Sequence, residues 1–163
     1  MTSGYAREGV PRDGLAGEVL TRLTAAGQTL AVAESLTGGL LAARLVDVPG
    51  ASAVLRGGVV AYATDLKHTL LGVSADLLAR VGAVHPEVAE QMAAGVRHRL
   101  GATWGLSTTG VAGPDPQDGQ APGTVFLGLA GPDGVRSVGL RLDGDRAQVR
   151  AATVDAALTL LLG

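Results

Sequence analysis

Apolar residues recur along this chain in short segments that glycine, proline and small polar residues separate. Leu15, Val19 and Leu23 fall at helical spacing and Gly27 follows them, which predicts an amphipathic helix over 15–26. Continuous apolar runs are typical of buried strands instead. Such a run at 29–33 predicts a buried strand, and further strands are predicted at 57–62 and 104–108.

Further helices are predicted wherever start and stop residues bracket an apolar segment. These helices cover 38–46, 65–71, the segment between Ser74 and Gly82, 86–100, and the segment from Asp145 to about Leu162. Thr64, Ser74 and Asp145 are interpreted as N-caps, and Pro86 occupies a first helical position. Gly131-Pro132-Asp133-Gly134 predicts a hairpin between strands at 124–130 and 135–142.

The resulting element order is α-β-α-β-α-α-α-β-β-β-α. Strands that helices separate favour parallel pairing, and the final hairpin adds antiparallel pairing. The prediction is an α/β fold in three layers, with a mixed, mostly parallel sheet and helices on both faces. No internal repeat or linker interrupts the pattern, so one domain is expected over 14–163, after a flexible tail over 1–13.

Composition narrows the class of protein. The 163 residues are 47% hydrophobic and 17% charged, with a net charge of −2, which is typical of a soluble globular domain. The lack of cysteine excludes disulfides and thiolate metal sites and favours a cytoplasmic location. Without a signal-peptide core, a bilayer-length apolar run or a basic stripe, neither membrane nor nucleic acid is expected as a partner. His68, His85 and His98 lack ligand spacing, and no metal or cofactor is expected.

Polar residues gather at the ends of several predicted elements. The four clusters are Ser35-Leu36-Thr37-Gly38-Gly39, Tyr62 to Lys67, Thr109-Gly110 with Gly113-Pro114, and Gly144-Asp145-Arg146. The first three follow predicted strands, and ligands of open α/β sheets bind beyond the carboxyl ends of parallel strands. The sequence therefore predicts a single site at that edge of the sheet.

Each of these residues has a functional and a structural interpretation. Ser35 is a nucleophile whose oxyanion would meet free N–H groups, or a helix cap. Lys67 is a desolvated base, or a solvated helix lysine. Tyr62 either relays a proton or orients the substrate, or it is a core aromatic with a tethered hydroxyl. Arg146 either binds an anion or is an ordinary surface arginine. Glu34 points away from Ser35 and caps or orients the loop.

Several short segments of this chain match the sequence motifs of one known protein family. They span residues 15 to 162 in unbroken order. They are Ala33-Glu34-Ser35-Leu36-Thr37-Gly38-Gly39, Val48-Pro49-Gly50-Ala51-Ser52, Gly57-Gly58-Val59-Val60-Ala61-Tyr62, Lys67 with Leu70-Leu71-Gly72-Val73, Gly82-Ala83-Val84, Thr109-Gly110-Val111-Ala112-Gly113-Pro114, Pro122-Gly123-Thr124-Val125, and Gly144-Asp145-Arg146 with Val149-Arg150. Together they resemble the CinA C-terminal-domain family, which includes stand-alone nicotinamide-nucleotide amidases.

The resemblance implies hydrolysis of the carboxamide of nicotinamide mononucleotide to nicotinic acid mononucleotide and ammonia. It makes Ser35 the nucleophile and Tyr62 and Lys67 the groups that assist proton transfer, with the choice of base left open between those two. The substrate-binding residues that it implies are Thr37, Gly38, Gly39, Thr109, Gly110, Gly113 and Arg146. It also implies a small mononucleotide as partner and a homo-oligomer. The alternatives are a non-catalytic nucleotide-binding or competence-associated module, and an amidase for another small amide.

Overall fold

The computed structural model describes residues 12–163. The predicted tail, 1–13, lies outside the described residues except for its last two positions, where the first helix begins. The elements are α1 (Arg12–Ala26), β1 (Leu30–Glu34), α2 (Leu40–Val46), the 3-10 helix η1 (Ala51–Ala53), β2 (Leu55–Val60), α3 (Thr64–Leu71), α4 (Ala75–Val81), α5 (Pro86–Leu100), β3 (Trp104–Gly110), β4 (Thr124–Gly131), β5 (Gly134–Arg141) and α6 (Arg146–Leu162). The predicted order is confirmed, with η1 as an addition.

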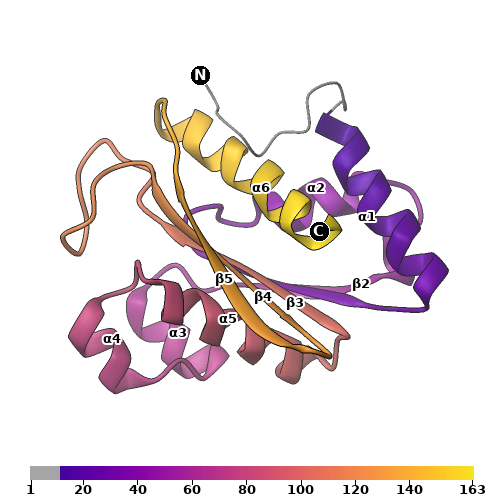
Figure 1. Ribbon diagram of the computed structural model, residues 1–163, viewed down its shortest axis with the longest axis horizontal. Coiled ribbons are helices and arrows are strands. Elements are labelled where there is room, and N and C mark those ends of the chain that lie inside the picture. Colours follow the sequence, from indigo (N-terminus) through magenta and orange to yellow (C-terminus); the bar gives the residue numbers. More distant parts are fainter. Residues whose placement is uncertain (1–11) are drawn as a thin grey trace.

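The strands form one five-stranded sheet within the described residues, in the order β2-β1-β3-β4-β5. β1 pairs in parallel with β2 and β3, whereas β4 pairs antiparallel with β3 and β5, so that β4 alone runs against the others. Helices α1, α2 and α6 cover one face, and α3, α4 and α5 cover the other (Figure 1). The predicted three-layer α/β class, with a mixed and mostly parallel sheet, is confirmed.

The core is divided by the sheet. Leu30 and Val32 of β1 pack in the cluster on the α1, α2 and α6 face, while Ala31 and Ala33 pack in the cluster on the opposite face. β1 lies between two strands and is covered on both faces, and every one of its residues is buried. This position explains why its residues 30–33 are continuously apolar rather than alternating. No helix among residues 12–163 combines the length and hydropathy that crossing a bilayer requires.

Helix α5 lies unusually close to the sheet. A Cβ atom at Gly105 of β3 would be 2.1 Å from the Ala93 carbonyl oxygen, and one at Gly128 of β4 would be 2.1 Å from that of Ala89. Only glycine permits this approach. Ser107 of β3 adds a hydrogen bond by donating to the Ala89 carbonyl oxygen at 2.6 Å. The first half of α5 is therefore held against β3 and β4.

Local capping chemistry was predicted well, with one exception. Ser74 accepts from the Leu77 N–H, and Asp145 forms a capping box with Gln148 at the start of α6. The prediction of Thr64 as a cap is wrong, because Thr64 is already the first residue of α3. Its N-cap is Ala63, which makes no side-chain capping bond.

Candidate active site

Ser35 lies on a tight turn directly after β1. Its N–H continues the sheet ladder by donating to the Thr108 carbonyl oxygen at 3.0 Å, and the Gly38 N–H closes the turn on the Ser35 carbonyl oxygen at 3.0 Å. The backbone N–H of Leu36 has no hydrogen-bond acceptor among the described residues. The main chain thus presents the serine hydroxyl at the edge of the sheet beside a free donor.

Arg150 of α6 holds the same turn from outside. Its Nε donates to the Leu36 carbonyl oxygen at 2.9 Å and its Nη2 to that of Thr37 at 3.0 Å. Arg150 is not among the site residues predicted from the sequence. It lies four residues after Arg146, on the same side of one helix, and that spacing is the signal by which the sequence could have identified it.

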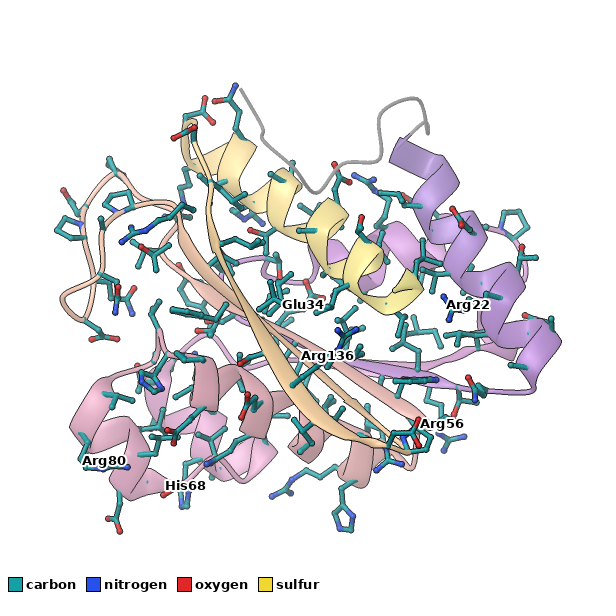
Figure 2. The ribbon with its side chains drawn as sticks, viewed as in Figure 1. Arg22, Glu34, Arg56, His68, Arg80 and Arg136 are labelled. Atoms are coloured by element: carbon teal, nitrogen blue, oxygen red, sulfur yellow. The ribbon has the colours of Figure 1, made fainter. Side chains whose placement is uncertain are left out.

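Glu34 occupies the N-terminus of α2. Its carboxylate accepts from the backbone N–H groups of Gly39 at 3.2 Å, Leu41 at 2.8 Å and Ala42 at 3.0 Å, and its side chain is buried. Figure 2 shows Glu34 on the side of the sheet that α2 and α6 cover, away from His68 and the α3–α5 layer. The helix terminus is therefore occupied by a carboxylate of the protein itself, and Glu34 has the orienting role that the sequence indicated.

Replacement of Glu34 by alanine is expected to lower the free energy of unfolding by about 3 kcal/mol, because three N–H groups of a buried helix terminus lose their acceptor. Urea unfolding followed by circular dichroism measures this loss. Glu34→Gln is the matched control, because it keeps one amide oxygen as acceptor and should lose less. Equal stability of Glu34→Ala and wild type would contradict this role.

Lys67 of α3 is buried against Ser35. Its Nζ lies 3.0 Å from Ser35 Oγ, 2.8 Å from the Ala61 carbonyl oxygen and 3.3 Å from the Tyr62 carbonyl oxygen. Burial lowers the pKa of Lys67 from 10.5 to about 8, an effect that the charge of Asp118 partly opposes. The pKa of the amine is thus brought close to physiological pH, so that a fraction of Lys67 is neutral there, as its interpretation as a base requires.

The two carbonyl groups orient this amine. A carbonyl oxygen can only accept, so a neutral Lys67 directs its two N–H groups to Ala61 and Tyr62. Its lone pair then faces Ser35 Oγ, the third neighbour. This is the arrangement in which the serine hydroxyl donates its proton to the amine.

A cavity of about 390 Å³ opens beside Ser35. Its walls come from the turn after β1, the α4–α5 junction, the loop after β3 and the start of α6. The lining residues are Ser35, Leu36, Tyr62, Ala83, Val84, residues 109–117 and Arg146. Of the predicted site residues, the fold thus brings Ser35, Tyr62, Thr109, Gly110, Gly113 and Arg146 to one pocket, with Lys67 bonded to Ser35.

Three predicted substrate-binding residues do not line this pocket. Thr37 is buried, with its hydroxyl 2.8 Å from that of Thr108. The N–H groups of Gly38 and Gly39 bond to the turn and to the Glu34 carboxylate, respectively. The reason is that the N-terminus of α2 faces Glu34 and not the cavity. These residues shape the turn that carries Ser35.

Tyr62 and Arg146 form a bracket at the mouth of the pocket. Arg146 donates through Nη2 to the Tyr62 hydroxyl at 3.0 Å and through Nη1 to the Gly113 carbonyl oxygen at 2.7 Å. The Tyr62 side chain is 60% exposed, and its hydroxyl makes no hydrogen bond to Ser35 or Lys67 among the described residues. Of the two candidate bases, the geometry therefore favours Lys67.

Comparison with known proteins agrees with the fold. The model of the CinA C-terminal domain family matches residues 12–163. A CinA-like protein of Frankia casuarinae is 58% identical over 149 residues, which cover 91% of this chain and 34% of the relative. A putative competence-damage inducible protein of Desulforamulus reducens is 52% identical over 135 residues, which cover 83% of this chain and 33% of that relative. The chain thus spans about a third of the length of these relatives.

Solved structures match over almost their whole length. The competence/damage inducible protein CihA from Agrobacterium tumefaciens has a TM-score of 0.89 and 36% identity, and the match covers 94% of this chain and 96% of that one. A CinA superfamily protein from Escherichia coli has a TM-score of 0.90 and 32% identity, with coverage of 93% and 89%.

Fold and site define a three-layer α/β domain with a buried serine–lysine pair at the carboxyl edge of its parallel strands. The family match and the relatives identify the domain further. The chain belongs to the CinA C-terminal domain family.

Proposed function

We propose that this protein is an amidase that hydrolyses the carboxamide of nicotinamide mononucleotide to nicotinic acid mononucleotide and ammonia. The observation that carries the proposal is the hydrogen bond of 3.0 Å between Lys67 Nζ and Ser35 Oγ, with the lysine buried and its pKa lowered to about 8. A nucleotide-binding module needs no such pair. The choice of substrate rests on the family resemblance, because a serine–lysine pair alone serves many amides.

In the first half of the reaction, neutral Lys67 accepts the proton of the Ser35 hydroxyl while Oγ attacks the carboxamide carbon. The Leu36 N–H stabilises the oxygen that becomes negative, in the manner of an oxyanion hole. Lys67, now protonated, passes its proton to the amide nitrogen. The C–N bond breaks, ammonia leaves, and an ester joins the nicotinoyl group to Ser35.

In the second half, a water molecule replaces ammonia in the pocket. Lys67, which is neutral again, takes a proton from this water as its oxygen attacks the ester carbon. The bond to Ser35 breaks and Oγ recovers the proton from Lys67. One amide and one water are consumed, and one carboxylic acid and one ammonia are formed.

Ammonia release from nicotinamide mononucleotide tests this function directly. Nicotinamide riboside and nicotinamide are the comparison substrates, because they lose the phosphate and then the ribose. We expect the mononucleotide to be hydrolysed most efficiently. Release only from a different amide would contradict the substrate, and mononucleotide binding without ammonia release would favour the non-catalytic module.

Replacement of Arg146 by alanine is expected to lower kcat/KM for the mononucleotide at least about tenfold, and to lower it far less for the riboside. A guanidinium has five N–H donors, and the bracket uses two of those of Arg146, so that others remain for a phosphate. A charge-assisted bond of this kind contributes roughly 1.5–3 kcal/mol.

Steady-state kinetics on both substrates measure this difference. Tyr62→Phe is the matched control, because it removes the hydroxyl of the bracket and leaves the guanidinium in place. It should reduce efficiency less than Arg146→Ala. Equal losses of Arg146→Ala on the two substrates would show that Arg146 holds the pocket together and does not bind phosphate.

A further inference from the structure

The loop between β3 and β4 contains a small hairpin next to the pocket. Gln117 and Gln120 exchange two backbone hydrogen bonds of 3.1 and 2.8 Å. Between them, Asp118 and Gly119 have φ values of 50° and 73°. Two consecutive left-handed residues with the sequence Asp-Gly are typical of a type I′ turn. The turn therefore sets the direction in which Asp118 leaves the loop.

Asp118 fastens this hairpin to the α4–α5 junction. Its Oδ2 accepts from the Ala83 N–H at 2.9 Å, and Thr109 Oγ1 donates to the Ala83 carbonyl oxygen at 2.7 Å. Ala83 lines the pocket, and both its backbone N–H and its carbonyl group are thus held by residues of β3 and the loop that follows β3. A Cβ atom at Gly82 would lie 2.6 Å from Asp118 Cγ, so the close approach depends on a glycine at that position.

Asp118 also acts on Lys67 through its charge. Burial is the larger effect on the pKa of Lys67 and lowers it, while the Asp118 carboxylate raises it. Other titratable groups on the neighbouring elements bond elsewhere, namely Glu34, Tyr62, His68, His85, Glu90, Arg97, Arg146 and Arg150. The remaining ones are exposed to solvent, namely Asp65, Asp76, Arg80, Glu87, His98, Arg99 and Asp115.

We propose that Asp118 is a positioning residue of the Ser35–Lys67 site, which fastens the 111–123 loop to Ala83 as a wall of the pocket and couples this fastened state to the charge of Lys67. The inference rests on the proposed function. A carboxylate favours a nearby ammonium ion, and linkage makes the effect reciprocal. Protonation of Lys67 therefore favours the fastened loop, and release of the loop favours the neutral base.

Lys67 is the only lysine in the sequence, which makes a direct test available. Protein grown with 13C-labelled lysine gives one side-chain methylene signal next to Nζ, and its chemical shift against pH reports the titration of Lys67 without any substrate. Three variants are compared with wild type. Asp118→Asn keeps an acceptor for Ala83 and removes the charge, Asp118→Ala removes both, and Asp115→Asn removes the charge of another carboxylate on the same loop.

We expect the titration midpoint of Lys67 to fall in both Asp118 variants and to stay unchanged in Asp115→Asn. In kinetics, the acidic limb of kcat/KM should move to lower pH in both Asp118 variants. KM should rise about tenfold only in Asp118→Ala, because only this variant loses the bond to Ala83.

An unchanged midpoint in Asp118→Asn would overturn the coupling, and an unchanged KM in Asp118→Ala would overturn the fastening role. The midpoint is measured without turnover, so it separates this inference from the proposed function. If the midpoint shifts but the protein releases no ammonia from the mononucleotide, the coupling of Asp118 to Lys67 is supported and the proposed amidase function is contradicted.

Discussion

Replacement of Ser35 by alanine is expected to reduce ammonia release from nicotinamide mononucleotide by at least about a thousandfold, because loss of a covalent nucleophile removes several powers of ten in rate. The fold should be preserved. The turn at Ser35 is held by backbone bonds to Thr108 and Gly38, none of which involves the hydroxyl. The bound mononucleotide should still protect the variant against thermal unfolding, since binding to the folded state stabilises it.

A coupled ammonia assay gives the rate, and circular dichroism with thermal unfolding gives the state of the fold. Ser74→Ala is a suitable control, because Ser74 caps α4 and does not line the pocket. Near-normal turnover in Ser35→Ala would reduce Ser35 to a structural residue of the turn. If Ser35→Ala loses both turnover and folding, the nucleophile is tested in the wild-type protein with a slow acylating substrate that should label Ser35. Failure to label Ser35 would contradict its assignment as the nucleophile.

Replacement of Lys67 by methionine is expected to lower kcat by at least about a thousandfold with little change in substrate affinity, because the base is lost while the pocket walls remain. In wild type, the neutral amine is the active form, so kcat/KM should rise with pH through a pKa of about 8. The variant should lack this limb. A mutant that raised only KM would make Lys67 a binding residue.

Lys67→Met should also change how the free energy of unfolding depends on pH. The pKa of Lys67 is 10.5 when exposed and about 8 in the folded protein, so the unfolded chain binds more protons between these two values. The free energy of unfolding of wild type should therefore gain as much as about 3 kcal/mol as pH rises from about 8 to 10.5. Below pH 8 both states are protonated, and the full penalty of burying the ammonium applies.

Lys67→Met cannot titrate, so it should lack this gain. Urea unfolding of both proteins at pH 7, 8, 9 and 10.5 measures the difference, and all other groups cancel in the comparison. Parallel curves for the two proteins would contradict a lowered pKa at Lys67.

Features that follow from local hydrogen bonds or from the pairing of parallel strands were predicted best. The caps at Ser74 and Asp145 follow from local hydrogen bonds, and the convergence of Ser35 with Thr109 follows from parallel strands whose carboxyl ends share one edge. The error at Thr64 is a displacement of one residue, which is typical of helix boundaries.

Tertiary contacts were beyond the sequence pattern. Burial of Lys67 depends on how α3 packs beneath Ser35, and the bond of Asp118 to Ala83 joins residues from a loop without periodicity. Exclusion of Gly38 and Gly39 from the pocket results from the direction of the Glu34 side chain. These contacts are set by the folded geometry and leave no signal at the level of residue type or spacing.

The glycine contacts beneath α5 have a consequence for engineering. Because Gly105 and Gly128 meet the helix through backbone atoms, no side chain can be trimmed or enlarged there to move α5 and the pocket wall that precedes it. Substitution of either glycine should therefore yield unfolded protein and no new specificity. The exposed segment 114–117, which also lines the cavity, is where directed evolution can reshape the pocket with little loss of stability.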